Sequence, residues 1–220
     1  MNIIIITSSL KPFSSNIPDD TRREQTLQTI SSVRKHFPKD LVILSDTSRE
    51  IITESESSVF SKCDYIINFG IGSNSYAYTV HKMKSFSESY MLLETLEHIK
   101  TLNLKGINRI FKLSGRYAIN SDFNIDAHNK KDKYVFKKAT KTWMNPIMNG
   151  ATHCFQTRFF SLDYSLIDDY ISILKNNISM LQHLDTEHAH FINIKKQNLH
   201  EIDIMNVEGV LEHDLSIVKD

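Results

Sequence analysis

Cysteine and long apolar runs are both scarce in this chain, and each scarcity excludes a class of protein. The 220 residues include two cysteines, Cys63 and Cys154, which lie far apart and form no CxxC motif. They provide neither a disulfide framework nor a zinc site, so a reducing compartment, the cytoplasm, is expected. The opening run at 3–6 has four apolar residues. That is too short for a signal sequence or a membrane span, and no later segment approaches about 18 apolar residues.

Net charge is missing as well. The chain has 26 Lys plus Arg and 26 Asp plus Glu. Proteins that bind nucleic acid usually carry an excess of positive charge, so the balance argues against such a partner. Six glycines and four prolines are few for this length, and no segment resembles a linker or a repeat. The composition, 40% hydrophobic and 24% charged, is that of an ordinary globular domain. We therefore expect one domain over 1–220.

Well-known catalytic motifs are also missing. The sequence contains no GxxxxGK[ST], GxGxxG, HExxH or GxSxG. P-loop NTPases, Rossmann dehydrogenases, zinc proteases of the HExxH type and α/β-hydrolases therefore lack their usual signatures here.

The apolar pattern of the first half predicts alternating strands and helices. Short aliphatic runs predict buried strands at 2–6, 41–44, 65–69 and 108–113. Apolar residues at helical spacing predict helices over about 21–36 and 85–100. Thr21 and Glu24 have the spacing of a capping box at the start of the first helix. A helical crossover makes the two strands that it joins parallel.

The second half is less regular. Its pattern predicts strands at 134–136 and 153–157, and an edge strand in the tail between 203 and 218. A long helix is expected from about Ser165 to Leu181, and a shorter one from Asp185 or Thr186. The whole order predicts an α/β fold with a mostly parallel twisted sheet and helices on both faces.

Polar clusters follow three of the predicted strands: Thr7-Ser8, Ser45-Asp46 and Ser114-Gly115-Arg116. In open α/β sheets, ligands bind beyond the carboxyl ends of the strands. Turns are polar in any protein, so each cluster alone has an ordinary explanation. Their coincidence favours one shared cleft.

Two basic segments could contribute to that cleft. Gly115 allows close approach of the backbone, and Arg116 offers a planar fork for phosphate or carboxylate, beside Tyr117. Arg116 could instead pair with a structural carboxylate such as Asp122. Lys82 and Lys84 precede a predicted helix that Ser85 could cap, which favours an anion. A solvated basic loop is the alternative for the lysines.

The best acid/base cluster is Asp185-Thr-Glu187-His188-Ala-His190. A carboxylate beside imidazoles can act as a general base near neutral pH. Glu187 and His190 are separated by three residues, so a helix places both on one side. No third metal ligand is evident. The alternative is a capped helix start, with Asp185 or Thr186 as the cap and the other polar side chains exposed.

Four segments together resemble GT-A-type glycosyltransferases of bacterial surface-polysaccharide synthesis and of large viruses. The first is the strand at 3–6 with Thr7-Ser8. The second is Arg23-x-Gln-Thr-x-x-x-Ile-x-Ser-x-Arg34 with Phe-Pro38 and the strand that leads to Asp46. The third is Lys84-Ser-x-x-Glu-x-Tyr90, followed by Ile110-Phe-Lys-Leu-Ser-Gly-Arg-Tyr117. The fourth is Glu187-His188.

The resemblance implies a nucleotide-sugar donor and transfer of its sugar to a hydroxyl of a saccharide or glycan. Thr7, Ser8 and Asp46 would hold the base and ribose, and Lys84 would approach the diphosphate. The donor-binding residues implied in this way are Thr7, Ser8, Arg23, Asp46, Lys84, Ser114, Gly115, Arg116 and Tyr117.

The chain departs from the family at Ser114-Gly115-Arg116, where many members carry Asp-x-Asp for a divalent ion. No metal ligand is assigned here, and dependence on Mn²⁺ or Mg²⁺ stays open. Arg116 could perform the metal's electrostatic task by neutralising the leaving diphosphate. In an inverting enzyme, Glu187 or Asp185 would deprotonate the acceptor, and His188 would orient that carboxylate.

The resemblance also divides the domain into a nucleotide-binding half, about 1–117, and an irregular acceptor and catalytic half, about 118–220. Two alternatives remain. The chain could be another nucleotide-using transferase, such as a nucleotidyltransferase, or a non-catalytic domain that binds nucleotide-sugars.

Overall fold

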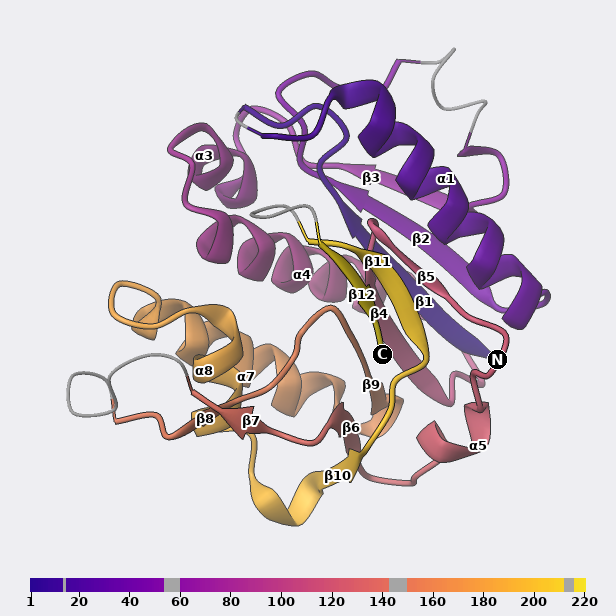
Figure 1. Cartoon of the computed structure of the whole chain (residues 1–220), viewed down its shortest axis with the longest axis vertical. Coiled ribbons are helices and arrows are strands. Elements are labelled where there is room, and N and C mark those ends of the chain that lie inside the picture. Colours follow the sequence, from indigo (N-terminus) through magenta and orange to yellow (C-terminus); the bar gives the residue numbers. More distant parts are fainter. Residues whose placement is uncertain (14, 54–59, 143–149, 212–215) are drawn as a thin grey trace.

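A computed structural model describes residues 1–13, 15–53, 60–142, 150–211 and 216–220 (Figure 1). In this part of the chain, seven strands form the main sheet. In sheet order they are β10 (Leu199–Ile202), β6 (Tyr134–Lys137), β9 (Phe159–Asp163), β4 (Arg109–Ser114), β1 (Asn2–Ser8), β2 (Leu41–Asp46) and β3 (Tyr65–Asn68).

The sheet is mixed but mostly parallel, as the sequence predicts. β1 is the centre of a parallel group and pairs with β2 on one side and β4 on the other, while β3 extends the group beyond β2. β9 runs antiparallel to both β4 and β6, and β10 pairs with β6 in parallel. The carboxyl ends of β1, β2 and β4 therefore meet at one edge of the sheet.

Helices cover both faces of the sheet, again as predicted. The Ser8 hydroxyl lies 3.3 Å from that of Thr26 on α1 (Asp19–His36). The Ser45 hydroxyl lies 2.9 Å from that of Thr95 on α4 (Lys84–Thr101). Ser45 is in register with Thr7, the neighbour of Ser8. Because successive strand residues point to opposite faces, α1 and α4 lie on opposite faces. α7 (Ile167–Met180) packs against α4, and α8 (Thr186–Asn193) packs against α7.

An aromatic cluster fills the core on each side of β4 and β9. Aromatic side chains bury large apolar areas, so these clusters contribute strongly to the fold. On the α1 side the cluster consists of Phe37, Phe111, Phe123, His128 and Phe159. On the α7 side it consists of Phe136, Phe155, Phe160, Tyr170 and His190.

The helix caps predicted at Thr21 and Ser85 are both wrong. α1 begins at Asp19 after Pro18, so Thr21 and Glu24 lie inside the helix and form no capping box. The fixed backbone of proline suits this position, and two aspartates follow in the first turn. α4 begins at Lys84 after Met83, and Ser85 is therefore helical and not a cap. The short helix α3 (Asn74–Val80), which Ser73 caps, was not predicted.

The strand predicted at 153–157 is confirmed only at its start. β8 (His153–Cys154) pairs with β7 (Thr140–Lys141), and residues 155–157 have no regular structure. β9, an inner strand of the main sheet, begins at Phe159. The main sheet has β3 at one edge and β10 at the other, and β10 lies before the tail where an edge strand was expected. In that tail, β11 (Val207–Val210) joins β12 (Ile217–Lys219) and β5 (Tyr117–Ile119) in a separate small sheet.

Short helical segments complete the described chain: α5 (Ile125–His128), η2 (Tyr164–Leu166) and η3 (Lys196–Asn198). Among the described helices, none combines the length and the apolar character that crossing a membrane requires.

Candidate functional site

Two pockets meet at the carboxyl edge of the parallel strands. The small pocket, about 150 Å³, lies beside the ends of β1 and β4. The large pocket, about 600 Å³, extends from there toward α8 and the segment before β9. Lys84, Glu88, Ser114 and Arg116 line both pockets, so the two form one continuous cleft. The sequence prediction of a shared cleft is therefore correct for the ends of β1 and β4.

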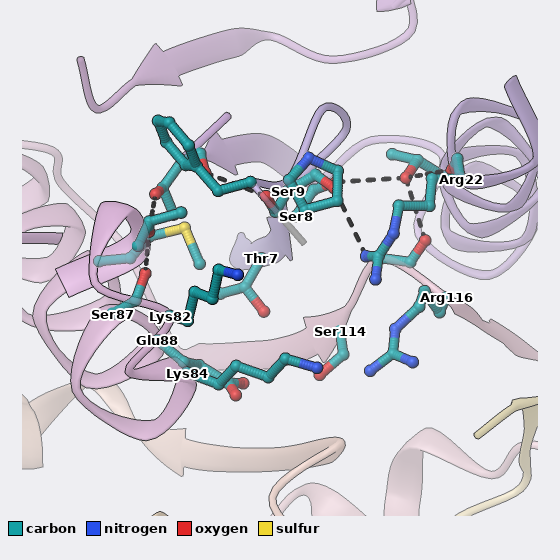
Figure 2. Close-up of a pocket in the computed structure, with 17 residues that line it drawn as sticks. Thr7, Ser8, Ser9, Arg22, Lys82, Lys84, Ser87, Glu88, Ser114 and Arg116 are labelled. Atoms are coloured by element: carbon teal, nitrogen blue, oxygen red, sulfur yellow. Dashed lines mark hydrogen bonds between the residues drawn. The ribbon is translucent and has the colours of Figure 1, made fainter. Parts of the chain in front are cut away.

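The small pocket brings together residues from several parts of the chain (Figure 2). Thr7 and Ser8 come from the end of β1, and Ser114 ends β4. Figure 2 shows the side chains of Lys82, Lys84 and Arg116 reaching into the space in front of Thr7 and Ser114. Cations thus converge where parallel strands end, which is a common place for an anionic ligand in α/β proteins.

Gly115 joins the cleft to the core of the fold. Its N–H donates to the Thr7 carbonyl at 2.8 Å, and its carbonyl accepts from the Thr26 hydroxyl at 3.1 Å. A Cβ atom at Gly115 would lie 3.2 Å from the Thr7 carbonyl oxygen. The missing side chain of Gly115 therefore lets its backbone lie close to β1 and α1. This contact fixes the positions of the neighbouring residues Ser114 and Arg116.

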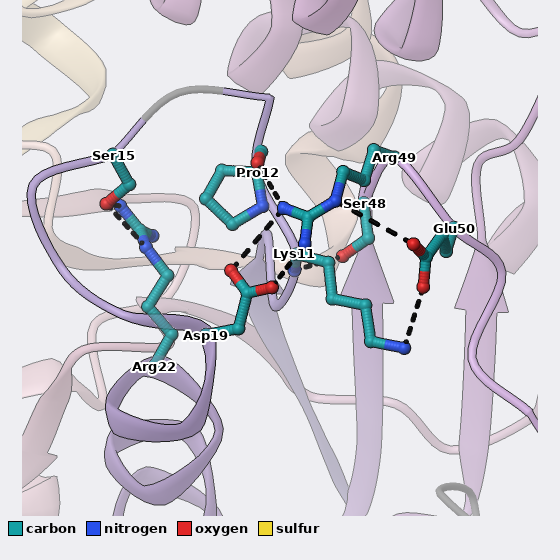
Figure 3. Close-up of polar contacts among 8 residues, drawn as sticks. All are labelled: Lys11, Pro12, Ser15, Asp19, Arg22, Ser48, Arg49 and Glu50. Atoms are coloured by element: carbon teal, nitrogen blue, oxygen red, sulfur yellow. Dashed lines mark hydrogen bonds and ion pairs between the residues drawn. The ribbon is translucent and has the colours of Figure 1, made fainter.

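The segment between β1 and α1 forms one wall of the small pocket, and Arg22 anchors it (Figure 3). The Arg22 side chain is almost fully buried. Its Nε and Nη2 atoms donate to the Ser15 hydroxyl at 3.0 and 2.8 Å. A planar guanidinium can hold one acceptor with two donors in this way, so Arg22 determines the path of the segment.

Charged contacts at the surface fasten the same segment to the residues after β2 (Figure 3). Arg49 bonds the Asp19 carboxylate and the Pro12 carbonyl, at 2.5 and 2.8 Å. Lys11 pairs with Glu50 at 3.1 Å. Exposed ion pairs contribute little free energy individually. Their effect here is geometric, because they tie this segment to the residues that follow β2.

Lys82 has an unusual backbone conformation. It follows α3 with a φ of 60°, in the left-handed region, and its N–H donates to the Thr79 carbonyl at 3.0 Å. Glycine usually occupies this position after a helix. Keeping a lysine there costs free energy, and its side chain points into the small pocket (Figure 2).

Replacing Lys82 with glycine is therefore expected to raise the free energy of unfolding by up to about 1 kcal/mol, because a left-handed residue loses its Cβ. The same change should weaken anion binding in the small pocket, because a cation is removed. Chemical denaturation and ligand titration measure the two effects. Lys82→Asn, which tolerates the left-handed region, is the matched control. A loss of stability in Lys82→Gly would contradict this interpretation.

A buried ion pair lies beneath the cleft, and the sequence did not predict it. Lys112 on β4 is 2% exposed, and its Nζ lies 2.5 Å from Oε1 of Glu88 on α4, which is 37% exposed. Lys112 also donates to the Ser114 hydroxyl and the Thr157 carbonyl, both at 2.8 Å. Burial alone would raise the pKa of Glu88, but the Lys112 ammonium lowers it below its usual value. Glu88 is therefore held as a carboxylate on the cleft floor.

Glu187 is the predicted catalytic residue that the structure brings to the cleft. It lies in the first turn of α8 and lines the large pocket. The Thr157 hydroxyl donates to its Oε1 at 3.1 Å. Burial raises the pKa of Glu187, and the negative charges of Glu88 and Asp185 raise it further. A half-buried carboxylate with a raised pKa has the properties of a general base near neutral pH.

Asp185 and His188 do not line either pocket. Asp185 is the N-cap of α8: its Oδ1 accepts the backbone N–H of His188 at 3.0 Å and also bonds the His188 ring. The other ring nitrogen of His188 lies 2.5 Å from the Thr142 hydroxyl. The cap agrees with the alternative that the sequence left open, but His188 and His190 are buried and not exposed as that alternative expected. His190 is buried against Tyr170, 2.8 Å from its hydroxyl, and lines neither pocket.

Among the predicted donor-binding residues, Thr7, Ser8, Lys84, Ser114, Gly115 and Arg116 line the small pocket, and Tyr117 lines the large one. Arg23 and Asp46 line neither of these pockets. Arg23 borders a separate hollow near Phe60, and the arginine of α1 that faces the cleft is its neighbour Arg22. Asp46 is 1% exposed and accepts the Leu10 N–H at 2.9 Å.

Asp46 should make stability depend on pH. Burial raises its pKa from 3.8 to about 6, which corresponds to roughly 3 kcal/mol. Between these pH values the native state binds more protons than the unfolded state, so the free energy of unfolding falls as pH rises. Asp46→Asn keeps the acceptor for Leu10 and removes the titration. Urea denaturation should show that the free energy of unfolding of the wild type, relative to this variant, falls by up to that amount between pH 4 and pH 7. Parallel profiles would exclude the raised pKa.

The cleft offers a poor site for a divalent metal. Ser114-Gly115-Arg116 provides a guanidinium where Asp-x-Asp would provide carboxylates, and Glu88 is already paired with Lys112. The described residues contain no group of three or more His, Cys, Asp or Glu side chains that could hold a metal ion. The donor set therefore does not fit a divalent cation, and we assign no metal ligand.

The fold is that of GT-A-type glycosyltransferases. The structure of the galactosyltransferase LgtC with donor and acceptor sugar analogs matches 90% of this chain and 72% of its own, with 10% sequence identity and a TM-score of 0.58. An active-site mutant of LgtC matches with a TM-score of 0.54 at 10% identity, over 90% of this chain and 72% of that one.

Core-mannan synthase A from Aspergillus fumigatus, in its Mn/GDP form, matches 94% of this chain and 74% of its own, with 10% identity and a TM-score of 0.52. No protein-family model and no curated protein match the sequence. The similarity to known enzymes is therefore one of fold.

Proposed function

We propose that this protein is a glycosyltransferase that moves a sugar from a nucleotide-sugar donor to a hydroxyl of a saccharide or glycan. The observation that carries the proposal is the cleft itself. Cationic side chains of Lys84 and Arg116 line it together with Glu187, a half-buried carboxylate of raised pKa. The fold supports the same reading, since LgtC was solved with donor and acceptor sugar analogs and core-mannan synthase A with GDP.

The small pocket would hold the nucleotide. Thr7 and Ser8 end β1 and offer hydroxyls to the ribose or base. Phe13, which packs edge-on against Tyr76, provides an aromatic wall. The first half of the chain, about 1–117, supplies this pocket. Arg22 and Thr47 line the small pocket, whereas their neighbours Arg23 and Asp46 do not. We therefore favour Arg22 and Thr47 as residues that contact the nucleotide.

The diphosphate would lie between the pockets, where Lys82, Lys84 and Arg116 are gathered. When the bond from the sugar to the diphosphate breaks, negative charge develops on the leaving oxygen. Preorganised cations that face this charge lower the barrier. We therefore assign to Arg116 the charge neutralisation that a metal performs in many family members.

Glu187 would act in the large pocket, on the acceptor. In an inverting reaction it takes the proton of the acceptor hydroxyl while that oxygen bonds to the anomeric carbon and the diphosphate leaves. Its raised pKa suits it to accept a proton near neutral pH. The second half of the chain, about 118–220, contributes Thr140, Cys154 to Arg158, Glu187 and Leu211 to this pocket, whereas Lys84 and Arg116 come from the first half. We place the protein in the cytoplasm, where nucleotide-sugars are available.

The test is release of free nucleotide from UDP-, GDP-, CMP- and dTDP-sugars with a mixture of glycan acceptors. One donor class should be consumed. Arg116→Leu should lower kcat by about 10²- to 10³-fold, the loss expected for one charge-stabilising donor, and Arg116→Lys by less. Consumption of a nucleoside triphosphate with release of pyrophosphate would favour a nucleotidyltransferase. Donor binding without turnover would favour a non-catalytic domain.

A further inference from the structure

The charges around the large pocket are unevenly compensated. Three cationic side chains line it, Lys84, Arg116 and Arg158, together with the carboxylates Glu88 and Glu187. Glu88 is paired with Lys112 beneath the pocket, and Glu187 accepts a hydrogen bond from the neutral Thr157 hydroxyl. Under the proposed function, the donor diphosphate occupies the place near Lys84 and Arg116. This leaves Arg158 without an assigned anion.

Arg158 is held firmly in place. Its guanidinium lies over the Tyr117 ring, 5.3 Å from the ring centroid. Its backbone carbonyl accepts the Ser114 N–H at 2.8 Å, which ties the start of β9 to the end of β4. Phe159 and Phe160, which follow it, are both buried in the aromatic core. A stacked guanidinium on a fixed backbone loses little conformational entropy when it binds an anion.

Two buried side-chain atoms of this segment have no hydrogen-bond partner among the described residues. Nη1 of Arg158 is buried and has no hydrogen-bond partner in the described part of the chain, and the same holds for Oε1 of Gln156. Gln156 and Arg158 line the same pocket. Buried polar groups are nearly always hydrogen-bonded, so groups without a partner in a pocket indicate that a ligand completes the arrangement. Arginine donors in a planar fork match a carboxylate or a phosphate.

We propose that the acceptor of this enzyme is an anionic saccharide, whose carboxylate or phosphate group binds Arg158 while its hydroxyl faces Glu187. This inference rests on the proposed function, and it adds the chemical class of the acceptor. Arg158 then acts in acceptor specificity and has no part in releasing the diphosphate. The carbohydrate ring would lie against Gln156 and Thr157, which line the pocket between Arg158 and Glu187.

Three matched acceptors test the proposal: methyl glucoside, methyl glucuronide and methyl glucoside 6-phosphate. They differ only in the group at C6. Initial rates are measured with the donor identified in the panel. At least one charged acceptor should have a kcat/KM roughly 10- to 100-fold above that of the neutral one, the range for hydrogen bonds between charged groups. The two charged compounds distinguish a carboxylate from a phosphate.

The variant Arg158→Met should remove this preference. KM for the charged acceptor should rise by roughly 10- to 100-fold, while KM for the donor stays unchanged. Arg158→Lys keeps the positive charge but loses the planar pair of donors. Its KM for the charged acceptor should lie between those of the wild type and of Arg158→Met. Lys175→Met, which removes an exposed charge on α7, should change nothing and is the matched control. Thermal unfolding verifies that each variant is folded.

Each other outcome overturns the proposal. Equal use of the neutral and charged acceptors would show that the pocket does not select an anion. A rise in donor KM for Arg158→Met would assign Arg158 to the diphosphate. If no nucleotide-sugar binds at all, the proposed function fails and this inference falls with it. Donor hydrolysis without acceptor is therefore recorded first, because it separates failure of the enzyme from failure of the acceptor class.

Discussion

Replacing Glu88 with leucine is expected to lower the free energy of unfolding by about 3 kcal/mol, since it leaves the Lys112 ammonium buried without its carboxylate. Lys112 is 2% exposed, and its remaining partners, the Ser114 hydroxyl and the Thr157 carbonyl, are neutral. The value lies at the low end for a broken buried pair because Glu88 reaches solvent. Urea denaturation at neutral pH measures the loss.

A double-mutant cycle separates the ion pair from the loss of packing. Lys112→Met alone should be milder than Glu88→Leu, because the remaining Glu88 carboxylate is 37% exposed and can be hydrated. The double variant should recover part of the stability lost in Glu88→Leu, since no buried charge is left unpaired. Purely additive effects would exclude the ion pair as the cause.

Replacing Glu187 with glutamine is expected to lower kcat by about 10²- to 10⁴-fold, the range for loss of a general base. The affinity for the donor should change little, because Glu187 lines the large pocket and not the small one. In the wild type, the rate should fall on the acid side of the pH profile at a higher pH than it would with a glutamate of ordinary pKa as the base. The base must be deprotonated, and burial raises its pKa. Stopped assays from about pH 4 to 9 measure the profile.

Asp185→Asn is the informative comparison. The sequence placed Asp185 beside Glu187 as a second candidate base, whereas in the structure Asp185 caps α8. Loss of its charge at the cap should lower stability by no more than about 1 kcal/mol. It should leave kcat within a small factor of the wild type. A large loss of kcat in Asp185→Asn with full activity in Glu187→Gln would reverse the two assignments.

The sequence predicted the parts of the fold where local pattern and burial agree. The aliphatic runs of β1 and β2 are fully buried from Ile3 to Ile6 and from Val42 to Leu44, so composition alone marks them as strands. β9 was missed although Phe159, Phe160 and Leu162 are buried. The strand predicted in this region ended at Thr157, before β9 begins. The sequence of a buried strand does not show where its pairing with the neighbouring strands starts. Only pairing with β4 and β6 fixes where β9 starts.

Several site residues were predictable because they follow strands. Thr7, Ser114 and Arg116 lie where β1 and β4 end, and the strand pattern locates those ends. On α1 the sequence singled out Arg23, whereas the arginine that lines the cleft is its neighbour Arg22. Arg22 shares the buried face with Thr26 and Val33, four and eleven residues further on, so helical spacing would have identified it.

The ion pair of Lys112 and Glu88 required the structure. A lysine between Phe111 and Leu113 in a buried strand is a signal in itself, because a buried charge needs a partner. The identity of that partner depends on how α4 packs against the sheet. Arg158 was missed because the strand predicted at 153–157 ends just before it, and the sequence alone gives no sign that this residue lines a pocket.

The central claim is that this cleft binds a nucleotide-sugar and that Arg116 and its neighbouring lysines neutralise the diphosphate without a metal. Isothermal titration of the nucleotide-sugar panel in the presence of EDTA, repeated with excess Mn²⁺, tests it most directly. We expect saturable binding of one donor class in EDTA, with little gain from Mn²⁺ and a marked loss in Arg116→Leu. Binding only in the presence of Mn²⁺, or no binding under either condition, would contradict it.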